Sequence, residues 1–117
     1  MHELSITQSV VDAVVEHTAG ARVLSVRLEI GALSGVEADA VRFCFDAVTR
    51  GTPVDGAELV IEHVPGEGRC GSCGADVRLT SFLDVCACGS TDVEVTSGQQ
   101  LRIRDVEVVR DVRNMRM

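Results

Sequence analysis

The sequence has 117 residues, a formal net charge of −7 and 45% hydrophobic residues, with three phenylalanines and no tryptophan or tyrosine. This length suits one ordinary domain, or a small domain with an attached lobe, and the core must be aliphatic. The acidic charge argues against nucleic acid as a partner, because phosphate binding needs a surplus of lysine and arginine. No apolar run approaches the ~20 residues that cross a bilayer, so no membrane association is expected.

The N-terminus and the cysteine count predict the cellular compartment. The first residues, Met-His-Glu-Leu-Ser, lack the basic and apolar regions of a secretory signal peptide. The cysteines number five, which is odd, and they lie at metal-binding spacing. These features predict a cytoplasmic protein.

Two segments have the hydrophobic periodicity of amphipathic helices. Residues 4–19 carry one apolar stripe and end at Gly20, and residues 37–50 carry another and end at Gly51. Cys44 lies beside the second stripe and is interpreted as a small core residue. The positions expected to be buried are Leu4, Val11, Val14, Val15 and Thr18 in the first helix, and Ala38, Val41, Phe45 and Val48 in the second.

Three segments alternate apolar and polar side chains, as strands with one buried face do. They are residues 22–30, in which Leu24, Val26, Leu28 and Ile30 share a face, residues 57–64 and residues 99–109. In the last segment the alternation shifts by one residue near Asp105, which predicts a β-bulge. The expected fold class is therefore α+β, with a small three-stranded sheet packed with two helices.

Four cysteines form two close pairs, Cys70-Gly-Ser-Cys73 and Cys86-Ala-Cys88. Tetrahedral Zn²⁺ takes four such ligands from two turns, and we interpret the cluster as a structural zinc site. The one-residue spacer of the second pair requires a tighter or irregular turn. Two disulfides and a redox dithiol are the alternatives, but a redox C-x-x-C should open a helix. His63, at the end of a predicted strand, is an alternative ligand.

The cysteine segment is expected to form its own lobe. Residues 65–68 (Pro-Gly-Glu-Gly) are predicted to be a linker, and the third strand begins after the cysteines. We therefore expect a zinc-ribbon-like lobe of residues 66–97, inserted into an α/β domain of residues 1–65 and 98–117. Metal binding should supply much of the folding energy of so small a lobe. Its apolar side chains, which could form a small patch, are Val77, Leu79, Phe82 and Leu83.

The N-terminus carries a second set of metal donors. The α-amine of Met1, the backbone amide of His2 and the His2 imidazole can face one ion through fused chelate rings. Ni(II) and Cu(II) favour such square-planar nitrogen sets. The alternative is that His2 is an ordinary solvated terminal residue, and these residues alone do not decide between the two.

No catalytic constellation is visible in the sequence. The three histidines lie in different predicted elements, and G-x-S-x-G, phosphate-binding-loop and H-E-x-x-H motifs are absent. We therefore expect a protein that is not an enzyme. Two further classes stay open on the residues alone: a zinc-ribbon adaptor between proteins that delivers no metal, and an acidic zinc-ribbon subunit of an enzyme.

Several motifs in combination carry a family resemblance. They are the N-terminal Met1-His2-Glu3, a helix, Glu29-Ile-Gly31-x-Leu33-Ser34-Gly-Val36, Gly56-Ala57-x-Leu59, and two cysteine pairs that close on Cys88-Gly89-Ser90. Over about residues 1–109 the chain resembles the HypA/HybF family. These are nickel metallochaperones for the maturation of nickel–iron hydrogenase and, in some bacteria, urease.

The resemblance implies two metal sites and two partners. Transiently bound Ni(II) would be held by the amine of Met1, by His2 and by backbone nitrogens that include Glu3, and Glu37 takes the place of an acidic contact found in some relatives. Structural Zn(II) would be held by Cys70, Cys73, Cys86 and Cys88. The implied partners are a nickel-delivery GTPase and the hydrogenase large subunit, with the chain as a monomer or homodimer.

Two positions depart from the family pattern. Val85 stands where the first cysteine of the second pair usually lies, and Cys86 follows one residue later. Zinc must therefore be reached through a different turn. Glu37 stands where the related contact is often Asp, so its side chain is longer by one methylene.

Overall fold

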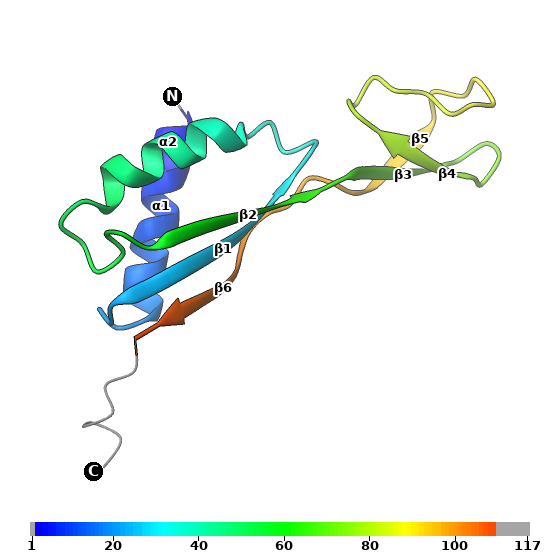
Figure 1. Cartoon of the computed structure of the whole chain (residues 1–117). Coiled ribbons are helices and arrows are strands. Elements are labelled where there is room, and N and C mark those ends of the chain that lie inside the picture. Colours follow the sequence, from blue (N-terminus) through cyan, green and yellow to red (C-terminus); the bar gives the residue numbers. More distant parts are fainter. Residues whose placement is uncertain (1, 110–117) are drawn as a thin grey trace, which may run out of the picture. The chain divides into compact units, whose positions relative to one another are not determined.

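The structure, a computed structural model, describes residues 2–109, and these form two helices and two three-stranded sheets (Figure 1). The elements in chain order are α1 (His2–His17), β1 (Val23–Gly31), α2 (Ala38–Thr49), β2 (Glu58–Val64), β3 (Gly66–Cys70), β4 (Asp76–Leu79), β5 (Val93–Ser97) and β6 (Leu101–Val108). The strand orders are β2-β1-β6 and β4-β3-β5. The predicted α+β class is confirmed, and the second sheet belongs to the cysteine segment.

Contacts divide the chain into two compact units. Among the described residues, one unit contains residues 2–27, Asp39–Val60 and residues 103–109, and the other contains Leu28–Ala38 and Ile61–Arg102. The division crosses β1, β2 and β6, so one end of each strand groups with the cysteine segment. The predicted domain borders, with residues 66–97 as a separate domain, stay a prediction. Within residues 2–109 the structure contains no helix long and apolar enough to span a membrane.

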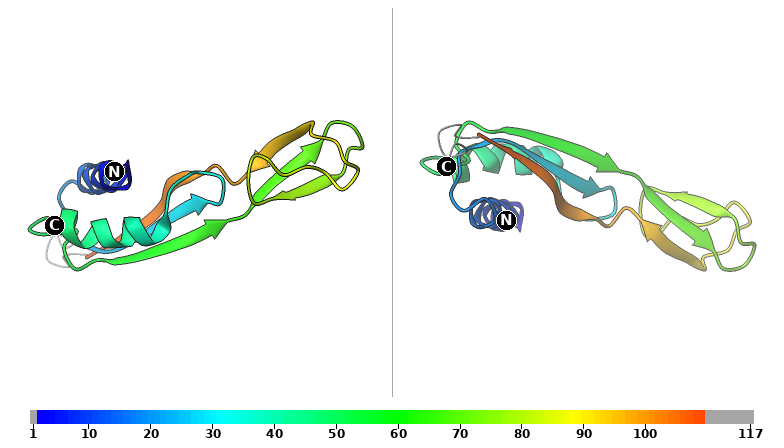
Figure 2. Two further views of the ribbon diagram at one scale, coloured as in Figure 1. Left: turned by 90° about the horizontal axis from the view of Figure 1, so that it is seen from above. Right: turned by 90° about the horizontal axis from the view of Figure 1, so that it is seen from below.

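The unit that contains both helices has the expected aliphatic core. Figure 2 shows the two helices beside the sheet formed by β2, β1 and β6. Side chains from both helices and from β1 are at most 3% exposed, namely Val11, Val14, Val23, Val26, Val41 and Phe45. Buried Thr7 and Thr49 also face this interior, and each hydroxyl donates to the carbonyl four residues earlier, at 2.6 and 2.7 Å. Burial of these hydroxyls therefore leaves no donor unpaired.

Two leucines predicted to be buried are exposed. Leu4 in α1 is 52% exposed and Leu24 in β1 is 50% exposed. In α1 the buried positions are Thr7, Val11 and Val14, so a threonine extends the stripe. Periodicity shows which face of a helix or strand is apolar. How much of that face other elements cover depends on tertiary packing.

Burial along the last strand shifts by one residue where the alternation in the sequence shifts, and the β-bulge expected near Asp105 stays a prediction. In β6 the half-buried positions Leu101 and Ile103 are followed by two consecutive exposed residues, Arg104 and Asp105, before Val106 resumes the pattern. Arg27 on β1 pairs with Asp105 at 3.6 Å.

The prediction of a linker at residues 65–68 is wrong, because Gly66 and Gly68 are buried positions of strand β3. A β-carbon on Gly66 would lie 2.3 Å from the carbonyl oxygen of Leu79, and one on Gly68 would lie 2.7 Å from that of Glu94. Close approach of neighbouring backbone therefore requires glycine here. The same residues in a sequence are typical of flexible connections, which explains the error.

A tight backbone junction joins the loop after β1 to the segment between β5 and β6. A β-carbon on Gly31 would lie 2.0 Å from the carbonyl oxygen of Gly98. Three backbone hydrogen bonds of 2.7–2.8 Å close the junction: Gly31 N–H to Gln100 O, Leu33 N–H to Gly98 O and Ala32 N–H to Val64 O. The loop of residues 31–38 is thus fixed to both chain segments that lead into the cysteine lobe.

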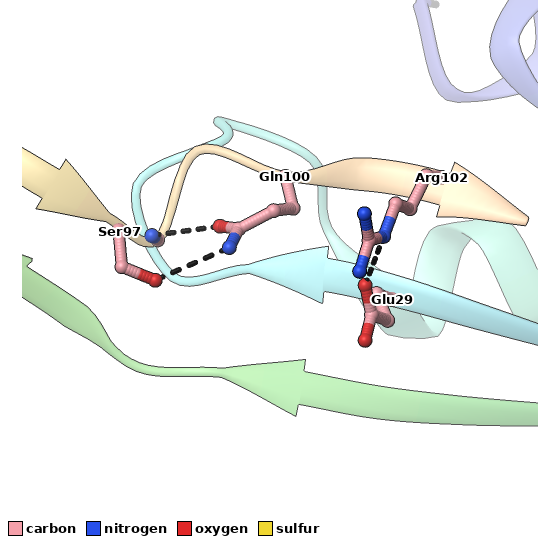
Figure 3. Close-up of polar contacts among 5 residues, drawn as sticks. Glu29, Ser97, Gln100 and Arg102 are labelled. Atoms are coloured by element: carbon pink, nitrogen blue, oxygen red, sulfur yellow. Dashed lines mark hydrogen bonds and ion pairs between the residues drawn. The ribbon is translucent and has the colours of Figure 1, made fainter. Parts of the chain in front are cut away.

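Three side-chain interactions lie at or next to this junction (Figure 3). Gln100 Oε1 accepts from the Gly98 N–H at 2.7 Å, and its Nε2 donates to Ser97 Oγ at 3.1 Å. Glu29 on β1 forms an ion pair with Arg102 on β6. The Glu29 carboxylate is desolvated, since the residue is only 7% exposed, and the guanidinium compensates its charge.

Candidate metal centres

The four paired cysteines converge on one point. Their sulfurs all lie within 4.8 Å of one another, with Sγ–Sγ distances of 3.7 Å for Cys70–Cys88 and 3.6 Å for Cys73–Cys86. In a tetrahedral site with Zn–S bonds of about 2.3 Å, the sulfurs are about 3.8 Å apart. The donor set and its spacing therefore fit zinc. The thiols are free rather than bridged, so the structure does not support the disulfide alternative.

The first cysteine pair is held by a turn at the end of β3. The N–H groups of Ser72 and Cys73 each point at the Cys70 sulfur, at 3.4 Å. Such N–H groups stabilise a thiolate, the form that binds metal. The next element is strand β4 rather than a helix, so the setting of a redox C-x-x-C is absent here.

The second pair reaches the metal position in spite of its one-residue spacer. The Cys86 N–H donates to Ser90 O at 3.1 Å, and the Gly89 N–H donates to Cys86 O at 2.8 Å. This narrow turn places Cys86 and Cys88 on the same side, toward the first pair. The hydroxyls of Ser72 and Ser90, 2.9 Å apart, link the two turns. The two serines are 18 residues apart in the chain, so no local sequence pattern connects them.

The four thiols differ in exposure and acidity. Cys70 and Cys86 are buried, whereas Cys73 and Cys88 are exposed. The backbone N–H of Cys73 stabilises the Cys70 thiolate and lowers its pKa to about 6. At Cys73 the N–H of Ala75 favours the thiolate, but the Cys86 and Cys70 thiols outweigh it and raise the pKa to about 11.

The pKa of Cys88 is also raised. The Ser90 N–H acts in the lowering direction, but the thiols of Cys86 and Cys70 prevail. Without metal, the exposed cysteines therefore retain protons at neutral pH that a bound ion has to displace.

The N-terminal donors lie at the start of α1. His2 is the first residue of that helix, and its side chain is 60% exposed. Its Nε2 lies 2.8 Å from Oε2 of Glu3, whose side chain is 14% exposed. Met1 lies outside the described residues. The imidazole is thus accessible to an ion from solution, with a carboxylate beside it.

Glu37 and His63 line one surface depression of about 330 Å³ next to the loop after β1. Both residues are exposed. They belong to the compact unit that contains the cysteines, whereas His2 belongs to the other unit. His63 is not part of the four-sulfur cluster, so its alternative role as a zinc ligand is not supported.

Comparison with known sequences identifies the family. A family model described as "Hydrogenase/urease nickel incorporation, metallochaperone, hypA" matches residues 1–108. The hydrogenase maturation factor HypA of Geobacter metallireducens is 53% identical over 109 residues, which cover 92% of this chain and 99% of that protein. HypA of Nostoc punctiforme is 46% identical over 108 residues, which cover 92% and 96%.

Two solved structures share the fold. The Ni metallochaperone HypA from Helicobacter pylori superposes with a TM-score of 0.64 at 23% identity, over 93% of this chain and 98% of that one. A second HypA solution structure gives a TM-score of 0.59 at 19% identity, over 91% and 92%. The fold, the four-sulfur cluster and a family match over nearly the whole sequence agree, and the chain belongs to the HypA family of hydrogenase and urease nickel-incorporation metallochaperones.

Proposed function

We propose that this chain binds Ni(II) at its N-terminus and delivers it during maturation of nickel–iron hydrogenase. The observation that carries the proposal is the accessible imidazole of His2 at the first residue of α1, in a chain of the HypA family. The amine of Met1, the imidazole and backbone nitrogens of His2 and Glu3 form a set that Ni(II) favours. Glu37 is proposed as an additional, weaker contact. Urease is a second possible recipient by the family's description.

Nickel is cargo in this proposal, and its transfer needs no covalent chemistry. An exposed site lets an incoming partner replace the nitrogen ligands one at a time. The imidazole and amine must lose their protons before they bind the ion, and protonated His2 can instead pair with Glu3. Nickel affinity should therefore fall as the pH falls.

The cysteine cluster has a different proposed role. Cys70, Cys73, Cys86 and Cys88 would hold Zn(II), which cross-links the two turns and stabilises the lobe. Four thiolates leave no ligand position open for a substrate, so we propose a structural rather than a catalytic metal. We further propose that the chain is not an enzyme and acts in the cytoplasm. Its proposed partners are a nickel-delivery GTPase and the hydrogenase large subunit.

The test is a calorimetric titration of Ni²⁺ into zinc-loaded, untagged protein, with zinc content checked by elemental analysis. We expect one nickel per chain in the parent and a loss of affinity of at least about tenfold in His2→Ala, since a chelate ring is removed. His17→Ala is the matched control, because His17 is exposed at the other end of α1 and should be neutral. Equal binding by parent and His2→Ala, or none by either, would favour the zinc-ribbon adaptor.

Glu37→Gln tests the weaker assignment in the same titration. The substitution keeps size and removes the charge, so nickel affinity should fall less than in His2→Ala. Unchanged affinity would remove Glu37 from the proposed site.

A further inference from the structure

The loop between β4 and β5 presents a cluster of apolar side chains to solvent. Phe82 is 60% exposed, Leu83 is 90% exposed and Val85 is 50% exposed. Among residues 2–109 the other large exposed apolar side chains, Leu4, Leu24, Phe43 and Val109, do not lie close together in sequence. Single exposed apolar residues are ordinary, whereas a cluster marks an interaction surface. We call Phe82, Leu83 and Val85 the apolar tip.

The turn that carries the apolar tip is fixed by hydrogen bonds. Asp84 Oδ2 accepts from the N–H and the hydroxyl of Thr80, both at 2.7 Å, and from the Ser81 N–H at 3.3 Å. The Leu83 N–H donates to Ser81 Oγ at 2.9 Å. Phe82 and Leu83 are thus held out from an ordered turn, and a partner that buries them has little backbone entropy to remove.

The lobe does not use the tip as its own core. Leu79, at 3% exposure, and the cysteines Cys70 and Cys86, at 1% and 4%, form its buried positions. The sequence predicted a small apolar patch of Val77, Leu79, Phe82 and Leu83, and in the structure Leu79 is buried whereas Phe82 and Leu83 are exposed. Their apolar surface remains available for a partner.

The net charge of residues 66–97 indicates which kind of partner surface the apolar tip can bind. Residues 66–97 contain five carboxylates and two arginines, a net charge of −3, and Arg69 pairs with Asp76 at 3.4 Å. A zinc ion with four thiolates would add about two negative charges. An acidic lobe is repelled by anionic membrane surfaces and by a second acidic copy of itself. It is attracted to a protein surface rich in lysine and arginine.

We propose that Phe82 and Leu83 insert into an apolar cleft with a basic rim on a maturation partner protein. The proposal rests on the maturation role of the family, but it does not require the N-terminal nickel site. The aromatic ring of Phe82 and the aliphatic side chain of Leu83 would supply the desolvated contact, and the net negative charge of residues 66–97 would supply long-range attraction.

The test measures binding of the zinc-loaded chain to two purified probes, the hydrogenase-maturation GTPase and the hydrogenase large-subunit precursor, by calorimetry at low and high salt. We expect the parent to bind at least one probe, more weakly at high salt. The double variant Phe82→Ser/Leu83→Ser should bind at least about tenfold more weakly. Phe43→Ser is the matched control, since Phe43 is 82% exposed on α2, and it should bind like the parent.

Leu83→Ser alone is a second variant, chosen because a side chain 90% exposed contributes little to folding. It should keep its zinc and still weaken binding. The proposal is overturned if neither probe binds the parent, or if the tip variants and Phe43→Ser behave alike. Self-association that only the tip variants lose would assign the tip to a second copy instead. Nickel titration of the same samples separates the two proposals, because the tip variants should bind nickel normally.

Discussion

At the scale of single residues, Glu29 carries a carboxylate that is almost fully buried and therefore needs a charged partner. The residue is 7% exposed, while its partner Arg102 has a side chain 66% exposed. Solvent therefore screens the charge of Arg102 in part. The ion pair stabilises the fold mainly because it compensates the charge of the desolvated Glu29 carboxylate. Alternating polarity predicted correctly that β1 is a strand, but it placed Glu29 on the solvent face.

We expect Arg102→Ala to lower the free energy of unfolding by about 1–3 kcal/mol, because it removes the charged donor that pairs with the buried carboxylate. Urea denaturation of zinc-loaded protein would measure this. Arg78→Ala, an exposed position on β4, is the control and should change the free energy little. Adding Glu29→Gln to Arg102→Ala should recover part of the loss. A full loss in the double variant would contradict this account.

Thiol acidity predicts how zinc binding depends on pH. Zinc needs four thiolates, whereas the pKa of Cys73 is raised to about 11 and that of Cys88 is also raised. At pH 7 these two thiols are protonated without metal, so zinc binding should release at least about two protons. Zinc affinity should then rise by at least about two decades per pH unit between about pH 6 and 8, and more steeply below about pH 6, where the Cys70 thiol is protonated as well. Competition with a chromophoric chelator at several pH values measures the slope, and a flat profile would disprove the assignment.

At the scale of elements, close approach of backbone decides where glycine must stand. A β-carbon on Gly31, at the end of β1, would lie 2.0 Å from Gly98 O, and one on Gly66, in β3, would lie 2.3 Å from Leu79 O. Gly98 O accepts from the Leu33 N–H in the junction, and Leu79 lies opposite Gly66 in the β3–β4 pairing, so neither backbone is free to move away. The loop that contains Glu37 and the two chain segments leading to the cysteines therefore share one closely packed contact.

We expect Gly31→Ala to destabilise the zinc-loaded protein by about 2 kcal/mol or more, because backbone atoms must separate to admit the methyl group. Gly35→Ala is the comparison. Its φ of +76° strains an alanine, but no atom lies within 4 Å of the added carbon, so its cost should be about 1 kcal/mol. Chemical denaturation ranks the two, and a smaller effect for Gly31→Ala would contradict the proposed packing.

At the scale of the whole molecule, residues 66–97 depend on a different force from the rest of the described chain. Buried aliphatic side chains of α1, β1 and α2 form the main core, whereas residues 66–97 bury Leu79, Cys70 and Cys86 and hold four sulfurs at one point. A lobe of this size gains much of its folding energy from metal.

Removal of zinc with a strong chelator should therefore unfold the lobe and leave the helices intact. Amide hydrogen exchange should show lost protection in β3, β4 and β5, with protection retained in α1 and α2. Cooperative loss of protection throughout would show that residues 66–97 do not fold independently of the helices, and would count against the predicted domain of residues 66–97.

The sequence by itself determined the local features of this protein and its family. Hydrophobic periodicity correctly predicted the two helices and the three strands of the first sheet. Cysteine spacing correctly predicted a cluster of four sulfurs that fits zinc. Both features depend on short-range geometry. The N-terminal motif and the cysteine pairs indicated the HypA family, which the comparisons confirmed. The nickel ligands Met1, His2, Glu3 and Glu37 stay a prediction.

Only the tertiary structure decided which apolar residues are covered and which glycines are packed. Exposed Leu4, Leu24, Phe82 and Leu83 were all predicted to lie on buried faces or in an apolar patch, and the glycines of β3 were predicted to be a linker. The reason is the same in both cases. A residue's pattern in the sequence is local, whereas burial and close backbone approach depend on segments far away in the chain, such as Leu79 and Glu94 beside the β3 glycines.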